Sequence, residues 1–79
     1  MRTQKEVNEG RAIELLTRIA TDAKERAATR VAACQALSTY MPQMEVVNAL
    51  SEILSRESET SEVRLAAILA LGRTRPNTV

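Results

Sequence analysis

The chain repeats itself at an interval of 34 residues, and this internal repeat limits the available folds more than any other feature. When residues 9–42 are aligned without a gap on residues 43–76, nine of the 34 positions are identical. The identical pairs are Leu16 and Leu50, Ile19 and Ile53, Glu25 and Glu59, Arg30 and Arg64, Ala32 and Ala66, Ala33 and Ala67, Ala36 and Ala70, Leu37 and Leu71, and Pro42 and Pro76. Compositional bias would not place a proline at the end of both units. The sequence therefore predicts a single domain, 1–79, with repeat 1 at 9–42, repeat 2 at 43–76 and a loose tail at 77–79.

Each unit has the apolar spacing of a helical hairpin. Apolar residues recur three and four positions apart in both halves of each unit, and polar segments separate the halves. Hairpins that recur at a fixed period stack on one another into solenoids. The predicted fold class is therefore all-α, with four short helices arranged as two stacked antiparallel helical hairpins.

Capping residues predict where some of these helices begin and end. Thr3 and Glu6 have the spacing of a capping box, which would open the first helix. Pro42 is suited to the first position of the third helix. Gly72 is suited to a left-handed stop after the fourth helix, which we expect over 62–71.

The core of such a chain has to be thin. Tyr40 is the only aromatic residue, so leucine, isoleucine, valine, methionine and alanine must supply the apolar contacts. We expect Leu37 and Leu71 to be equivalent and buried. A chain of 79 residues buries only about 60% of its unfolded surface. Self-association is therefore an expected source of further burial.

The residues that most enzymes need are missing from this chain. It has no histidine, which is the commonest general base and metal ligand. Gly10 and Gly72 stand alone rather than in a phosphate-binding loop. Cys34, the single cysteine, falls in the middle of a helix, where we expect a buried structural thiol. The sequence predicts a protein that is not an enzyme and binds no cofactor or metal ion.

The sequence also predicts a cytoplasmic protein. A single cysteine excludes an intramolecular disulfide, which is typical of reducing compartments. The first eleven residues are polar and do not resemble a signal peptide. The longest apolar run, 65–71, is too short to span a bilayer.

The second helix of each unit carries a recognisable pattern. The segments TRVAACQAL (29–37) and VRLAAILALG (63–72) resemble the HEAT-repeat family, whose units carry a similar Val-Arg-x-Ala-Ala-x-x-Ala-Leu-Gly sequence. The resemblance covers nearly all of the chain beyond the first eight residues and implies an α-solenoid that acts through protein–protein contacts. Family members often have an aspartate some six residues before the arginine, where this chain has Lys24 and Ser58. A period of 34 residues also suits tetratricopeptide repeats, but their aromatic and glycine positions have no match here.

The arginines allow two interpretations. Arg30 and Arg64 are expected to pair with acidic groups of the preceding turn or of the neighbouring repeat. Alternatively, Arg64, Arg73 and Arg75 are candidates for a phosphate contact, as in a small phage-type or bacterial helical protein that binds a nucleic-acid backbone. A net charge of +1 predicts that such binding is weak at physiological salt. A fragment of a longer solenoid is a further alternative, because Pro76 stands where another helix would begin.

The fourth helix has more apolar surface than the rest of the chain can cover. Residues 62–71 are apolar nearly all round, and a helix of that kind needs cover on all sides. Leu65, Ile68 and Leu69, with Val46 of the third helix, are predicted to form the interface of a homodimer, most simply a two-fold one. The sequence therefore predicts a self-associating interaction module that binds a protein partner as an adaptor or regulator, with no membrane partner.

Overall fold

The computed structural model describes residues 3–73, which form four α-helices and one short 3-10 helix. The α-helices are α1 (Gln4–Thr21), α2 (Ala27–Leu37), α3 (Met44–Ser55) and α4 (Ser61–Gly72), and the 3-10 helix η1 (Ser38–Tyr40) extends α2. No strand occurs within residues 3–73. The predicted all-α fold class is confirmed. Arg75, Pro76 and the tail 77–79 lie outside the described residues.

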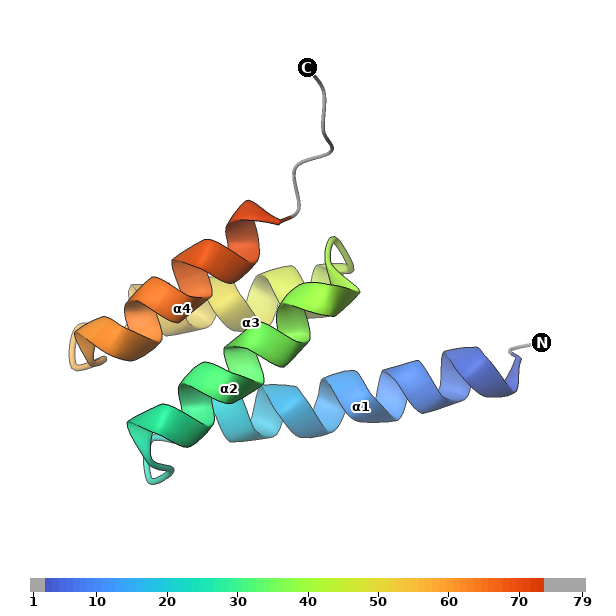
Figure 1. Cartoon of the computed structure of the whole chain (residues 1–79), viewed down its shortest axis with the longest axis horizontal. Helices are drawn as coiled ribbons and strands as arrows, with labels where there is room; N and C mark the ends of the chain where they lie inside the picture. The colour runs from blue at the N-terminus through green and yellow to red at the C-terminus, as the bar shows by residue number, and fades with distance from the viewer. Residues whose placement is uncertain (1–2, 74–79) are drawn as a thin grey trace, which may run out of the picture.

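The four helices are stacked as two antiparallel hairpins. α1 packs against α2 and α3 against α4, while α1 also packs beside α3 and α2 beside α4. The two first helices therefore form one layer and the two second helices the other (Figure 1). The N-terminal half of α1 extends beyond the other helices (Figure 1). Each described helix is too short or too polar to cross a lipid bilayer.

The capping box at the start of α1 is present as predicted. The Glu6 N–H donates to the Thr3 hydroxyl at 3.1 Å, and the Thr3 N–H donates to the Glu6 carboxylate at 2.8 Å. This reciprocal pair satisfies two of the amide groups that a helix N-terminus leaves without partners. α4 begins in a similar way, because the Thr60 hydroxyl accepts from the Val63 N–H at 3.3 Å.

The structure corrects two predicted helix ends. Pro42 is not the first residue of α3, because α3 begins two residues later, at Met44, with Gln43 as its N-cap. Gly72 is not a left-handed stop, because it remains within α4 and no described glycine has a positive φ. The Arg73 N–H instead donates to Ala70 O and Leu71 O, which tightens the last turn of α4.

The core lies between the four helices and is built from aliphatic side chains and alanine. Its largest fully buried side chains are Leu37, Leu50, Ile53, Val46, Val63 and Cys34. Buried alanines at 33, 66, 67 and 70 permit a close approach between neighbouring helices. Leu37 is fully buried as predicted, but its counterpart Leu71 is only half-buried. Leu37 has the second hairpin beside it, whereas no further described helix covers Leu71.

Candidate functional site

Three large apolar side chains share the solvent-exposed side of α4. Leu65, Ile68 and Leu69 are 56%, 50% and 63% exposed. Their spacing of three and four residues puts them on one side of the helix. The opposite side is buried and consists of Val63, Ala66, Ala67 and Ala70. We call the three exposed residues the α4 face.

The internal repeat explains why this face lacks cover. The positions of α2 that correspond to Leu65 and Ile68 hold Val31, which is half-buried, and Cys34, which is fully buried. α2 lies between α1 and α4, whereas α4 packs mainly against α2 and α3. Two of the three residues of the α4 face thus occupy positions that are covered by a neighbouring hairpin in the first unit. Leu69 differs, because its counterpart Gln35 is also exposed.

The structure removes Val46 from the predicted interface. Val46 has no exposed surface and belongs to the core. It lies four and seven residues before Leu50 and Ile53, so all three project from the same side of α3 into the core. Of the four residues predicted for the interface, the three on α4 are exposed and Val46 of α3 is not.

A buried ion pair joins the two hairpins. The Nε of Arg30 donates to Ala20 O at 2.9 Å, and its two terminal nitrogens donate to the Glu59 carboxylate at 2.8 and 2.5 Å. The two side chains are only 5% and 3% exposed. The prediction that Arg30 pairs with an acidic group of the neighbouring repeat is confirmed.

The environment of Glu59 favours its charged form. Burial alone would raise the pKa of Glu59, but hydrogen bonds from Arg30 and the Thr60 N–H, with the charges of Arg30 and Arg56, outweigh burial and lower it. The pair is therefore ionised at neutral pH. Glu59 carried a sequence signal, since it is one of the nine residues repeated in both units.

Arg56 reinforces the junction between the hairpins, and no sequence pattern pointed to it. One terminal nitrogen donates to Thr21 O at the end of α1 at 2.7 Å, and the other pairs with Glu52 at 2.8 Å. The corresponding residue of the first unit is Asp22, so the repeat alignment did not single out Arg56. It links the C-terminal ends of α1 and α3 through backbone and side-chain acceptors.

Arg64 and Arg73, two of the three predicted phosphate-binding arginines, lie at opposite ends of α4. Arg64 is half-buried and donates to the carbonyl oxygens of Leu54 and Arg56, so the prediction that it pairs with an acid is wrong. Arg73 is exposed at the other end of α4, about 13 Å further along the helix axis. Arg75 lies outside the described residues. Among the described residues, the structure therefore does not bring these arginines together.

The single cysteine has a structural place. Cys34 is fully buried in the core. Burial raises the pKa of the Cys34 thiol. The negative charge of Glu59 adds to this rise, and the positive charge of Arg30 opposes it without cancelling it. A thiol with a raised pKa and no access to solvent is a poor nucleophile. The interpretation of Cys34 as a buried structural thiol is confirmed.

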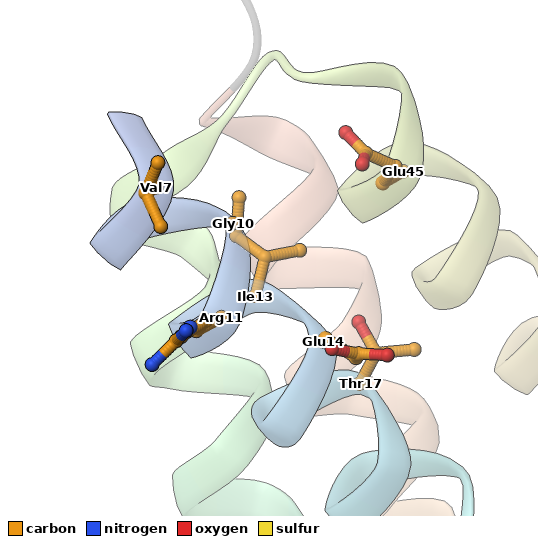
Figure 2. Close-up of a pocket in the computed structure, with 7 residues that line it drawn as sticks. All are labelled: Val7, Gly10, Arg11, Ile13, Glu14, Thr17 and Glu45. Atoms are coloured by element: carbon orange, nitrogen blue, oxygen red, sulfur yellow. The ribbon is translucent and has the colours of Figure 1, made fainter. Parts of the chain in front are cut away.

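A hollow that the sequence did not predict lies between α1 and the start of α3. It has a volume of about 480 Å³ and is lined by Val7, Gly10, Arg11, Ile13, Glu14, Thr17 and Glu45. Figure 2 shows Glu45 across the hollow from the α1 residues. Its carboxylates outnumber its one cation, so the hollow is acidic. No group of histidine, cysteine, aspartate or glutamate residues within 3–73 has the arrangement of a metal site.

Comparisons with known proteins give one match. The family model described as HEAT repeats matches residues 13–79. Neither the curated proteins nor the solved structures gave a match.

Proposed function

Because the chain belongs to the HEAT-repeat family, we propose that it is a non-catalytic interaction module that self-associates as a homodimer and binds a protein partner. HEAT repeats are generally protein-interaction modules that build solenoids, and the family is typically a non-catalytic scaffold. The chemistry of the chain agrees with this role. It has no histidine, and its only thiol is buried. A reducing compartment such as the cytoplasm suits that single thiol.

The observation that carries the proposal is the α4 face. Three large apolar side chains, each at least half exposed, adjoin one another on one helix. Such surfaces are typical of protein interaction sites when they are contiguous. A second copy of the chain is the occupant we propose, and a following repeat in a longer chain would cover the same face.

The energetic argument favours coupling between folding and association. Each of these leucine and isoleucine side chains is already about half covered, so covering the rest contributes about half of the roughly 1.5–3 kcal/mol of full burial, before the entropic cost of association. The whole stability of a domain of this size is about 3–5 kcal/mol. Association is therefore expected to raise the apparent stability, and the midpoint of thermal unfolding should increase with protein concentration.

Sedimentation equilibrium of the wild type and of Leu69→Glu tests the proposal. The wild type should associate at tens of micromolar. In a two-fold dimer built on the α4 face, Leu69→Glu should be monomeric and less stable to denaturant. Gln35→Glu is the matched control, because it adds the same charge at the corresponding exposed position of α2. A wild type that stays monomeric, with Leu69→Glu fully tolerated, would contradict self-association.

The nucleic-acid alternative is separated by a gel shift at two salt concentrations. Weak binding that disappears at physiological salt is expected from the net charge of +1. Tight duplex binding at that salt, lost on Arg73→Ala with Arg75→Ala, would instead favour the alternative.

A further inference from the structure

The interface between α2 and α4 inside the chain has two different halves. We assign Val31 and Cys34 to the α2 half with Arg30, because both are covered in α2 while their counterparts in α4 are exposed. The α4 half offers the small residues Ala66 and Ala70, and the loop before α4 supplies Glu59 to Arg30. One hairpin thus supplies bulk and a cation, and the next supplies a flat alanine surface and a carboxylate.

The internal repeat places a second set of these halves at the two ends of the molecule. On α4, the counterparts of Val31, Cys34 and Arg30 are Leu65, Ile68 and Arg64. The first two are exposed, and Arg64 has no carboxylate partner among the interactions of the described residues. α2 packs beside α4 (Figure 1), and Leu65 and Ile68 are exposed on α4 despite this contact.

The first unit presents the complementary half. Its counterparts of Ala66, Ala70 and Glu59 are Ala32, Ala36 and Glu25. Ala32 and Glu25 are exposed, and Ala36 is half-buried. We call Ala32, Ala36 and Glu25 the α2 end. The α4 end of the chain therefore carries the large apolar side chains and the arginine. The α2 end carries the alanine surface and the carboxylate.

We infer that a second copy of the chain stacks head to tail, with Leu65 and Ile68 of one copy against Ala32 and Ala36 of the next. This inference rests on the proposed self-association and specifies its geometry. It differs from the closed two-fold dimer expected from the sequence, because a two-fold α4 contact leaves the α2 end unused. A head-to-tail pair keeps one free α4 face and one free α2 end, so the wild type should add further copies as its concentration rises. Leu69 lies outside this contact, since its counterpart Gln35 is exposed beside the second hairpin, so Leu69→Glu should still associate. A head-to-tail contact repeats an interface that the chain already forms within itself.

The charges of the two ends support this orientation. Glu25 of the second copy corresponds to Glu59, the carboxylate that Arg30 binds inside the chain. Arg64 already donates to Leu54 O, the counterpart of the Ala20 O contact of Arg30. The other acceptor of Arg64, Arg56 O, also accepts a hydrogen bond from the Glu59 N–H. This carbonyl oxygen therefore keeps a donor if Arg64 moves to bind Glu25 of the second copy. A charge-assisted bond to Glu25 is stronger than the neutral contact it replaces.

Variants that block one end each test the geometry. Ile68→Glu blocks the α4 face, and Ala32→Glu blocks the α2 end. Both positions are exposed, so each variant is expected to fold as a monomer, which far-UV circular dichroism checks. Sedimentation equilibrium is then run on each variant alone and on their equimolar mixture. Asn48→Glu is the control, because Asn48 is exposed on α3 and its counterpart in the first unit is Glu14.

Head-to-tail stacking predicts that each blocked variant is monomeric alone and that the mixture forms a one-to-one dimer through the two intact ends. Asn48→Glu should associate like the wild type. The inference would be overturned if Ala32→Glu dimerises alone and the mixture contains no heterodimer of the two variants. Self-association itself would still stand. A wild type that is monomeric throughout overturns both.

A charge reversal tests the ion pair separately. Glu25→Arg should weaken association about tenfold, since it sets two cations against each other across the contact. Glu57→Arg makes the same change on an exposed residue of the loop before α4 and should alter the dissociation constant less than twofold. Equal effects of the two variants would refute a specific role for Glu25.

Discussion

Arg30 and Arg64 occupy the same place in two copies of one motif, yet their surroundings differ. Both guanidinium groups donate to the carbonyl oxygen ten residues earlier, at Ala20 and Leu54. Arg30 also binds the buried Glu59 carboxylate of the next hairpin, whereas the other acceptor of Arg64 is a backbone carbonyl oxygen. The local contact therefore belongs to the hairpin itself, and the ion pair belongs to the junction between hairpins.

The helices that carry these arginines differ in the same way. Cys34 is buried and its counterpart Ile68 is half exposed, although the two helices share five identical residues from the arginine to the leucine. Burial in this fold is decided by the neighbouring hairpin rather than by the helix's own sequence. Substitutions at matched positions of the two units can separate the contributions.

Loss of the buried ion pair should have the largest effect. Arg30→Met leaves Glu59 buried without its partner, which costs about 3–5 kcal/mol. That is close to the whole stability expected of such a domain, so the variant should be largely unfolded in a urea titration. Arg64→Met, which removes contacts to carbonyls only, should lose about 1–3 kcal/mol.

A double substitution checks the cause of that loss. Arg30→Met combined with Glu59→Leu removes both charges, and replacement of a buried pair by apolar residues is often close to neutral. The double variant should therefore be more stable than Arg30→Met alone. A double variant that is no more stable would show that Arg30 acts through its contact with Ala20 O.

Truncation of the repeated leucine should have the next largest effect. Leu37→Ala removes a fully buried side chain and should cost about 2–5 kcal/mol. Leu71 is only half-buried, so Leu71→Ala should cost about half as much. Chemical denaturation at low protein concentration measures both in the monomer. Equal losses would mean that Leu71 is covered in solution as fully as Leu37.

The sequence predicted the shared features of the two units and missed what depends on their neighbours. The helical hairpins, the capping box and the burial of Leu37 and Cys34 follow from local spacing and were confirmed. The exposure of Leu71 and the backbone contacts of Arg64 depend on which hairpin lies next to α4. An alignment of one repeat on the other treats both ends as equivalent and cannot show that difference.

Val46 was misplaced for a related reason. Its apolar stripe was correctly recognised, but periodicity does not say whether a stripe faces the core or a partner. The stripe of α3 is enclosed, because α3 packs against both α1 and α4. Arg56 and the hollow between α1 and α3 arise from contacts between distant segments and had no counterpart in the repeat.

Acid should weaken the junction before it affects the separate hairpins. The pKa of Glu59 is lowered in the folded chain, so the stability it supplies is fully present above the unfolded carboxyl pKa of about 4.3. That contribution is lost as the pH falls through the lower folded value. Urea titrations below pH 5 should show a steep loss of stability in the wild type and in the control Glu57→Gln, which changes an exposed glutamate of the loop before α4. Glu59→Gln should be less stable at pH 7 and lose less on acidification, and a wild type with no loss would contradict the prediction.

The smallest expected effect comes from the N-caps of α2 and α4, where the first unit has an arginine and the second a threonine. Arg26 and Thr60 are the N-caps of α2 and α4 and have nearly the same backbone angles, −65° and 148° against −73° and 156°. The Thr60 hydroxyl accepts from the Val63 N–H, while Arg26 makes no side-chain cap and puts a positive charge near the positive end of the helix dipole. Because the backbone is already suitable, Arg26→Thr should stabilise the chain by about 1 kcal/mol, seen as a higher thermal midpoint. The reciprocal Thr60→Arg should lower stability by about the same amount, and an unchanged midpoint in both would show that the N-terminal amides of these helices find other partners in solution.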